Sequence, residues 1–281
     1  MEKKSCQDKP CCGGVCCDDP VKKHYGAIAV EKTDQELASQ VALRAGYTKE
    51  DLDLIPPEAR LGQGCGNSVF AAELKPGEMV LDIGCGAGMD LFLAGQKVGP
   101  TGKAVGVDFL EEMVKRGTET AKKYKRDNVE FYCSPVECMP FMENTFDVAI
   151  SNCVLNLVPD KIKAFAGICR VLKKGTGRFT VSDIVLKKKL PEELETNIAA
   201  VVGCIGRAIT GETYKSNLEQ AGFTGVQVID KGLDIAKLFG DCLGTAVFCC
   251  GSEAKKLDTS VMDKYDLNEY VMSCIVKAYK P

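Results

Sequence analysis

Histidine is nearly absent from this sequence, because His24 is the only one among 281 residues. That scarcity disfavours His-rich zinc sites and the Ser/His or Cys/His pairs of nucleophilic enzymes. No apolar run approaches the roughly 20 residues that span a bilayer. The stretch after Met1 lacks the apolar core of a secretory signal. We therefore expect a cytoplasmic protein with no membrane partner.

The sequence also lacks an excess of charge of one sign. Its 36 Lys and Arg residues nearly balance 39 Asp and Glu residues, and the formal net charge is -3 at pH 7. Proteins that bind nucleic acid are usually strongly basic, so no nucleic-acid partner is expected. No sustained heptad pattern or obvious apolar patch is visible, which favours a monomer.

Cysteine, in contrast, is abundant, with 16 residues. In a cytoplasmic enzyme the thiols are mostly reduced, which favours metal or metalloid binding or redox chemistry over structural disulfides. Four cysteines lie in apolar periodic segments and are expected to act as small buried hydrophobes. These four are Cys85, Cys133, Cys169 and Cys274. Five more are clustered near the N-terminus, at Cys6, Cys11, Cys12, Cys16 and Cys17.

Short apolar runs alternate with helix-length segments from Glu78 onward. Strands are expected at residues 79–83, 104–107, 129–132, 146–151, 178–184, 226–229 and 246–249. Helices are expected at 89–97, 111–125 and 161–172, and another is expected to open at Pro191. This alternation is typical of βαβ units with right-handed crossovers. The fold class is therefore α/β, with a seven-stranded, mostly parallel sheet and helices on both faces.

The chain divides into three parts by pattern. Residues 1–24 have no helical or strand period and are expected to form a flexible, Cys-rich arm. Residues 25–231 form the main domain, in which 33–44 reads as a helix with Thr33 as its cap and Glu36 completing a capping box. Residues 232–281 are an extension that completes the sheet or forms a small subdomain. The role of its last apolar segment, 270–279, stays open.

A glycine-rich turn, Gly84-Cys85-Gly86-Ala87-Gly88, follows Asp82 where the first strand ends and a helix begins. A dinucleotide fingerprint would need a third glycine at position 89, where Met89 stands. A second carboxylate, Asp108, ends the next strand. The pattern resembles the first motifs of class I S-adenosylmethionine-dependent methyltransferases, which have a Rossmann-like fold.

The resemblance implies S-adenosylmethionine as cofactor. Asp108 can accept both ribose hydroxyl hydrogens, and Phe109 is placed to cover the adenine. The family contacts the adenine edge after the third strand, and Asn152 follows the fourth strand, at the edge of the sheet where ligands bind. The implied cofactor-binding residues are Asp82, Gly84, Cys85, Gly86, Gly88, Asp108, Phe109, Val136, Glu137 and Asn152.

Three cysteine-bearing segments narrow the resemblance to arsenite methyltransferases. They are Gly64-Cys65-Gly66-Asn67, Ser151-Asn152-Cys153-Val154-Leu155-Asn156-Leu157-Val158-Pro159-Asp160-Lys161 and Gly203-Cys204-Ile205-Gly206-Arg207-Ala208. With Tyr25-Gly26, the resemblance covers residues 24 to 231 and implies that Cys65, Cys153 and Cys204 bind trivalent arsenic. Arsenic is soft and thiophilic, so thiolates are its natural ligands. Methyl transfer to its lone pair demands positioning and no general base, in agreement with the shortage of histidine.

The family also carries a cysteine upstream of the one equivalent to Cys65, which takes part in a disulfide relay. This chain has none between Cys17 and Cys65, so Cys16 and Cys17 are the candidates for a relay or for arsenic capture. A separate soft-metal site or a tail without a role stays open for them. Cys249-Cys250 is a second redox pair or packs in a strand.

Arsenite or its thiol conjugates are the implied substrate, with methylated arsenicals as products and arsenic detoxification as the role. A thiol reductant, thioredoxin or glutathione, and a thiol–disulfide reductase are the implied partners. Two other functions stay open, namely a methyltransferase of a small organic molecule and a metalloid-binding protein with a vestigial cofactor fold. The intact Asp82, glycine turn and Asp108 argue against the latter.

Overall fold

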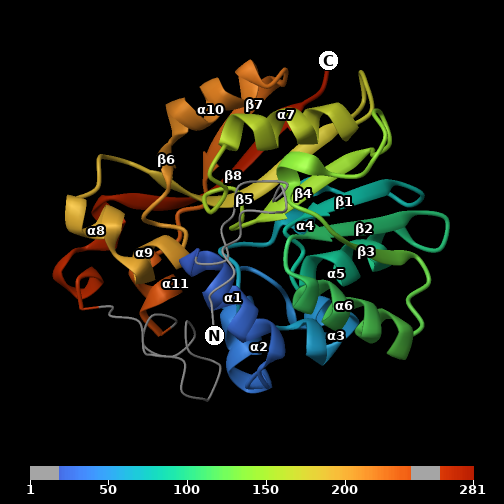
Figure 1. Ribbon diagram of the computed structural model, residues 1–281, viewed down its shortest axis with the longest axis horizontal. Helices are drawn as coiled ribbons and strands as arrows, with labels where there is room; N and C mark the ends of the chain where they lie inside the picture. The colour runs from blue at the N-terminus through green and yellow to red at the C-terminus, as the bar shows by residue number, and fades with distance from the viewer. Residues whose placement is uncertain (1–18, 242–259) are drawn as a thin grey trace, which may run out of the picture.

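The computed structural model describes residues 19–241 and 260–281. One sheet forms its centre, with strand order β3-β2-β1-β4-β5-β8-β7, and β6 pairs with β5 beside this path (Figure 1). β8 is antiparallel to both of its neighbours, and the other pairs are parallel. The strands are β1 (Met79–Ile83), β2 (Lys103–Asp108), β3 (Val129–Cys133), β4 (Val148–Asn152), β5 (Arg178–Leu186), β6 (Ile209–Thr210), β7 (Thr224–Asp230) and β8 (Val271–Tyr279).

Helices precede, connect and follow the strands. They are α1 (Pro20–Val30), α2 (Gln35–Arg44), α3 (Lys49–Leu54), α4 (Ser68–Ala72), α5 (Met89–Val98), α6 (Glu111–Lys123), α7 (Lys161–Val171), α8 (Glu192–Thr196), α9 (Ile198–Val202), α10 (Gly211–Gln220) and α11 (Ile235–Asp241). None of the helices in the described ranges combines the length and apolar character that crossing a bilayer requires. The α/β class with helices on both faces is confirmed, as is a mostly parallel sheet.

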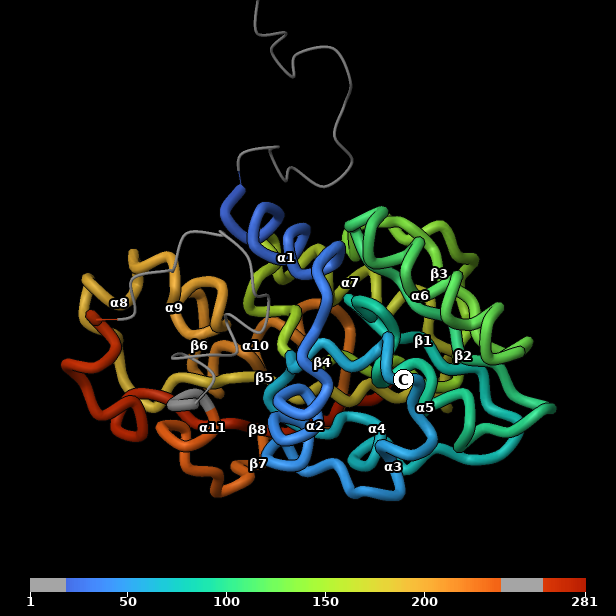
Figure 2. The backbone as a smooth tube through the Cα atoms, turned by 90° about the horizontal axis from the view of Figure 1, so that it is seen from below, coloured from blue at the N-terminus to red at the C-terminus, as the bar shows by residue number. Residues whose placement is uncertain are grey.

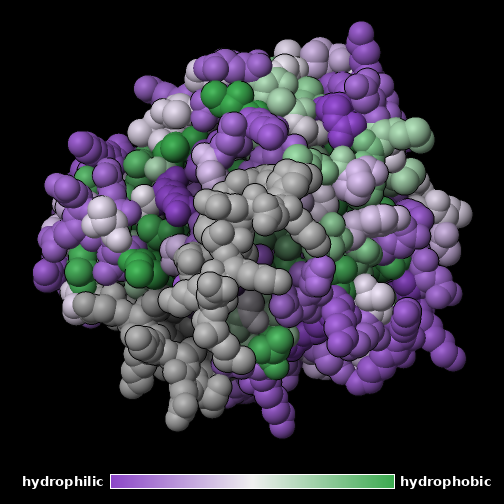
Figure 3. All heavy atoms as spheres, viewed as in Figure 1, coloured by the Kyte–Doolittle hydropathy of each residue, from purple (hydrophilic) through white to green (hydrophobic). Residues whose placement is uncertain are grey.

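Two hydrophobic clusters fill the space between the sheet and its helices. Neighbouring residues of a strand point to opposite faces, so Leu81 of β1 packs with α7 and α10, while Val80 packs with α4 and α5. Both side chains are fully buried. Strands covered on both faces read as continuous apolar runs, which is why the parallel strands were recognisable from the sequence. In Figure 3, hydrophilic side chains dominate the lower right of the surface.

The last apolar segment of the chain is β8, the strand whose role the sequence left open. It lies between β5 and β7 and pairs with β5 along its whole length, from Val271 opposite Leu186 to Tyr279 opposite Arg178. The C-terminal extension therefore completes the sheet. With the two-residue β6, the described part of the sheet has eight strands. The strand expected at 246–249 lies outside the described residues.

Two expectations for the N-terminal region were wrong. Residues 20–24, assigned to the flexible arm, form the first turn of α1, because Asp19 accepts a hydrogen bond from the Val21 amide and Pro20 occupies the first turn. Asp34, not Thr33, caps α2, since its carboxylate accepts the amide hydrogens of Glu36 and Leu37. The Thr33 hydroxyl instead accepts a hydrogen bond from Arg116.

Phe179 provides a test of this core. It is fully buried in β5, with its ring centroid 5.7 Å from that of Phe223 and 6.5 Å from that of Phe165. Phe179→Ala leaves a cavity and should lower the free energy of unfolding by about 3–5 kcal/mol. The matched control Phe70→Ala, with a side chain 81% exposed, should change it by less than about 0.5 kcal/mol. Urea titrations followed by circular dichroism measure both, and equal losses would contradict this packing.

Candidate functional site

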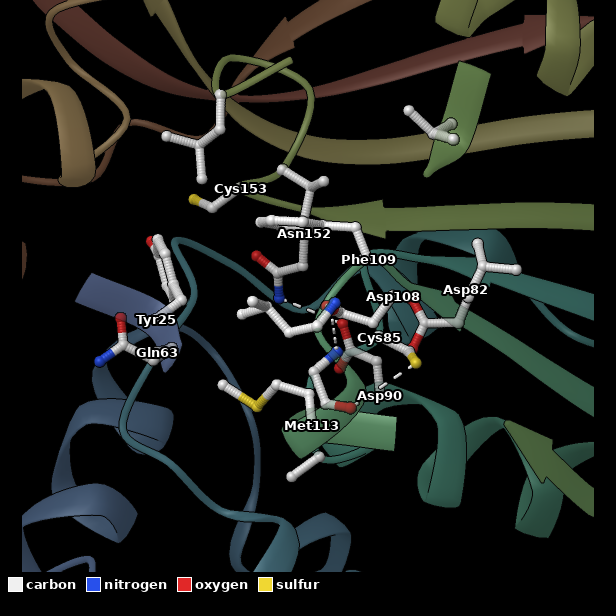
Figure 4. Close-up of a pocket in the computed structure, with 18 of the residues that line it drawn as sticks. Tyr25, Gln63, Asp82, Cys85, Asp90, Asp108, Phe109, Met113, Asn152 and Cys153 are labelled. Atoms are coloured by element: carbon white, nitrogen blue, oxygen red, sulfur yellow. Dashed lines mark hydrogen bonds between the residues drawn. The ribbon is translucent and has the colours of Figure 1, made fainter. Parts of the chain in front are cut away.

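A pocket opens at the edge of the sheet where the parallel strands β1, β2 and β4 end (Figure 4). The strand order changes direction at β1, because β2 and β3 lie on one side of it and β4 and β5 on the other. Open α/β sheets bind ligands at such a switch point, outside the carboxyl ends of the strands. Segments before β1 contribute Asp19, Tyr25, Tyr47 and Gln63 to the pocket wall.

The glycine turn forms the floor of the pocket. Gly84 and Gly86 line it with φ angles of 66° and 53°, and a Cβ atom at Gly84 would collide with the side chain of Val154. Gly88, expected in the same role, is not among the residues that line the pocket. It begins α5 at a φ of 99°, and a Cβ there would lie 2.6 Å from the Phe131 ring. A glycine is required at this position because α5 packs closely against the Phe131 ring of β3.

Among the acidic residues that line the pocket, Asp82, Asp90 and Asp108 are buried (Figure 4). Burial, together with the neighbouring Asp90 and Asp108, raises the pKa of Asp82 well above its usual range. Its Oδ2 atom is buried, and no group in the described chain forms a hydrogen bond with it. Grouped carboxylates with unused acceptor capacity favour a ligand that carries positive charge and hydrogen-bond donors.

Asp108 is oriented by the backbone around it. The amides of Gly86 and Leu110 donate to its two oxygens at 2.9 and 3.0 Å. Burial raises its pKa to about 6, although these hydrogen bonds act in the opposite direction. Next to it, Phe109 lines the pocket, as do Val136 and Glu137 beyond β3. The structure therefore brings these predicted residues to one cavity.

Cys85 also lines the pocket, although it is 8% exposed and burial raises its pKa well above the usual thiol range. Cys169 and Cys274 are buried too, as expected of packing residues. Cys133 is exposed, contrary to expectation, because β3 is the edge strand and its end faces solvent.

Asn152 lines the pocket, and its side-chain amide also forms hydrogen bonds with neighbouring protein groups. Its Oδ1 accepts the Cys65 amide at 3.1 Å, and its Nδ2 donates to the Gly66 carbonyl at 2.5 Å. Nδ2 also lies 3.1 Å from both Tyr47 Oη and Asp90 Oδ2, and Tyr47 Oη donates to Asp90. Sequence reasoning missed Tyr47 and Asp90. The carboxylate of Asp90 in an otherwise apolar helix start was a usable signal, whereas nothing local identified Tyr47.

The three predicted arsenic ligands come from three separate loops and lie together beside this pocket. Cys65 and Cys153 form a disulfide with a Cα–Cα distance of 6.0 Å. The Cys204 thiol donates to the Cys153 carbonyl at 2.7 Å. Cys153 and Cys204 adopt positive φ angles of 58° and 65°, a region that costs energy for residues with a Cβ. Cys16 and Cys17 lie outside the described residues.

Asp183 of β5 was also missed, although a lone carboxylate in an apolar strand is an unusual feature. One of its oxygens and the sulfur atoms of Cys65 and Cys153 all lie within 4.8 Å of one another. Asp183 is fully buried, and burial raises its pKa to about 7. Asn156 Nδ2 donates to its Oδ1 at 2.9 Å and to the Cys204 carbonyl at 3.1 Å. Asn156 therefore ties the Cys204 loop to β5.

Helix α1 covers one side of the pocket, between α6 and α9 (Figure 2). Tyr25 of α1 lines the pocket and donates its hydroxyl to the Val202 carbonyl at 2.9 Å. Arg116 of α6 donates to the carbonyls of Ala29 and Glu31 at the other end of the helix. These contacts hold α1 against both α9 and α6, on the two sides of the pocket.

Comparisons with known proteins agree with this geometry. A family model described as a methyltransferase domain matches residues 74–222. An arsenite methyltransferase of Halobacterium salinarum is 34% identical over 271 residues, covering 96% of this chain and 62% of that protein. The arsenite methyltransferase of Homo sapiens is 28% identical over 245 residues, covering 79% of this chain and 64% of that protein. The chain thus spans less than two thirds of the length of these relatives.

The fold has a counterpart among solved structures. An arsenic(III) S-adenosylmethionine methyltransferase from Chlamydomonas reinhardtii superposes with a TM-score of 0.60 at 24% identity, covering 87% of this chain and 73% of that one. The family model includes the glycine turn, Asp82, Asp108, Asn152 and two of the three clustered cysteines. Because this family model matches more than half of its length, the chain belongs to the methyltransferase domain family.

Proposed function

We propose that this chain transfers methyl groups from S-adenosylmethionine to trivalent arsenic held by cysteine thiolates. The observation that carries the proposal is that Cys65 is bonded to Cys153 and the Cys204 thiol contacts the Cys153 carbonyl, at the side of a pocket lined by buried carboxylates. Cys153 itself lines that pocket. The names of the arsenite methyltransferase relatives support the same reading.

The carboxylates and apolar side chains that line the pocket fit S-adenosylmethionine. The free acceptor atom of Asp82 suits the ammonium of the amino-acid part, and Asp108 suits the two ribose hydroxyls. Phe109 and Val136 offer apolar surface to the adenine, with Glu137 beside them. When bound there, the cofactor supplies a methyl group activated by its sulfonium. The chain's own residues orient the cofactor and surround it with negative charge.

The cysteines act on arsenic only after the Cys65–Cys153 bond is reduced. Two electrons and two protons from a thiol reductant, thioredoxin or glutathione, convert the disulfide to two thiols. Each protein thiolate then replaces a hydroxide or thiol ligand of the incoming arsenite or arsenite conjugate. Three sulfur ligands leave the arsenic lone pair as the nucleophile, so the main contribution of the protein is positioning. A thiol–disulfide reductase is the expected partner, and detoxification of arsenic the role.

Cys16 and Cys17 are proposed to resolve the oxidised site or to capture arsenic for it. Asp19 lines the pocket, and Arg207 of the Cys204 segment lies 4.0 Å from its carboxylate. The described part of the chain therefore begins at the pocket wall, two residues after Cys17 in the sequence.

Other expectations remain predictions. These are the cytoplasmic location, the monomeric state, the lack of nucleic-acid and membrane partners, and the division at residue 231.

Removing one proposed ligand should separate arsenic chemistry from cofactor binding. Cys153→Ser, Cys65→Ser and Cys204→Ser are each expected to lower arsenic methylation by about a hundredfold or more, because the acceptor loses its position. The affinity for S-adenosylmethionine should change little. Cys169→Ala, buried in α7 away from the pocket, is the control and should retain activity. Label transfer from methyl-labelled cofactor into arsenic species measures this, and full methylation by Cys153→Ser would refute the ligand assignment.

The raised pKa of Asp108 predicts how cofactor binding depends on pH. Since this pKa is about 6, the carboxylate becomes ionised as pH rises through 6, and only that form accepts two hydroxyl hydrogens. The dissociation constant for S-adenosylmethionine should therefore be about tenfold larger at pH 5 than at pH 7. In Asp108→Asn the step near pH 6 should vanish, while steps from other groups persist. Calorimetry at each pH tests this, and identical profiles for both proteins would contradict it.

The N-terminal thiols can be tested by comparing first and later turnovers. Transfer of a methyl cation to the arsenic lone pair leaves pentavalent arsenic, and its return to the trivalent state takes two electrons from the Cys65 and Cys153 thiols, which form a disulfide. The double variant Cys16→Ser with Cys17→Ser should perform the first methyl transfer normally and then slow by about tenfold, because this disulfide accumulates. The double variant Cys11→Ser with Cys12→Ser is the matched control. Rapid-quench kinetics and mass spectrometry of the disulfide follow both. Unchanged multiple-turnover rates in the first variant would exclude the relay.

A further inference from the structure

Two donors from the C-terminal strands hold the backbone of Cys65. Lys231, directly after β7, donates from Nζ to the Cys65 carbonyl at 3.0 Å. Ser273 of β8 donates from Oγ to the same carbonyl at 2.9 Å. The two residues are joined to each other, because the Lys231 amide donates to the Ser273 carbonyl at 3.0 Å. Both lie outside the segment that the family model matches.

The two glycines that flank Cys65 give its loop little conformational preference of its own. Cys65 stands between Gly64, with a φ of 115°, and Gly66, and glycine lowers the cost of alternative conformations. Ordering a residue costs backbone conformational entropy. External contacts must therefore supply the order that a positioned sulfur requires.

Those contacts surround the Cys65–Gly66 peptide. Asn152 accepts a hydrogen bond from the Cys65 amide and donates one to the Gly66 carbonyl. Lys231 and Ser273 both donate to the Cys65 carbonyl, which lies between these two groups. A Cβ at Gly66 would collide with Lys231 Nζ and Ser182 Oγ, so only a glycine at this position lets Lys231 approach so closely.

One donor is sufficient to satisfy a buried carbonyl, and Ser273 provides it from a fully buried position. The second donor is an ammonium, which is costly to bury. Burial lowers the pKa of Lys231 to about 8, which reflects that cost. Lys231 is partly buried and so gives up some of its hydration to contact a carbonyl that already has a donor, which indicates a role beyond hydrogen-bond completion.

We propose that Lys231 and Ser273 are positioning residues that hold the Cys65 sulfur in place to receive arsenic with Cys153 and Cys204. We refer to Lys231 and Ser273 as the Cys65 clamp. The arsenic part of this inference rests on the proposed function, whereas the claim that the clamp positions Cys65 can be tested without arsenic. Its consequence is that the C-terminal extension contributes to the acceptor site.

The test uses the reduced full chain and the variants Lys231→Met and Ser273→Ala. Lys231→Met keeps an unbranched apolar side chain and removes the ammonium. Lys277→Met is the matched control, since Lys277 lies on β8 and pairs with Glu73 at 2.9 Å, away from the cysteines. Iodoacetamide labelling is followed by mass spectrometry at Cys65, Cys153 and Cys204 in the same molecules, so each protein supplies its own internal reference.

Cys65 is 1% exposed, so its labelling should be slow in the wild type and about tenfold faster in both clamp variants. The rates at the other two cysteines should change less than about twofold. Equal labelling of Cys65 in all proteins, or a joint rise at all three cysteines, would overturn the proposal. Lys277→Met should label at the wild-type rates. A faster labelling of Cys65 in this control would also overturn the proposal.

Arsenic kinetics then separate this inference from the proposed function. The clamp variants should raise the KM for arsenite by about tenfold while the affinity for S-adenosylmethionine is unchanged. If the wild type does not methylate arsenite but Cys65 labelling depends on the clamp, the proposed function fails and the clamp stands. If the wild type methylates arsenite and neither labelling nor KM responds, the clamp fails alone.

Discussion

The side-chain amide of Asn152 joins the proposed cofactor pocket to the loop that carries Cys65. It occupies the end of β4, binds the backbone on both sides of Cys65, and contacts Tyr47 and Asp90 on the cofactor side. A single planar group with two donors and one acceptor oxygen thus fixes the relative placement of both halves of the site. The distance between methyl donor and acceptor depends on this placement, and in-line transfer is sensitive to shifts of about 1 Å.

Burial of carboxylates is the main electrostatic cost of the site. Asp82, Asp90 and Asp108 lie around one pocket, and burial raises the pKa of each. Uncompensated buried charge destabilises a fold. A cationic ligand relieves that repulsion, so the same feature that weakens the free protein strengthens binding of S-adenosylmethionine. Because a ligand that binds only the folded state stabilises it, the cofactor should also stabilise the fold.

Local patterns in the sequence predicted the cofactor half of the site better than the acceptor half. The strand β1 and its glycine turn were predicted at their observed positions, since a buried parallel strand and a tight turn are both written in consecutive residues. The nearness of Cys65 to Cys153 came from family resemblance. Tyr47, Lys231 and Ser273 could not be predicted, because each acts through a partner far away in the sequence. Hydrogen bonds of that kind leave no periodic signal.

The acceptor half is consequently a product of the whole fold. Cys153 and Cys204 are held at positive φ, at a cost of about 1–3 kcal/mol each, and such conformations persist only where the surroundings impose them. Asn156 holds the carbonyl of Cys204. The backbone of Cys65, which is not at positive φ, is held by Asn152, Lys231 and Ser273. The family-matched segment alone contains the cofactor turn but neither Cys65 nor its two C-terminal donors. The proposed arsenic chemistry therefore depends on segments on both sides of the family-matched core, because contacts between these segments position Cys65.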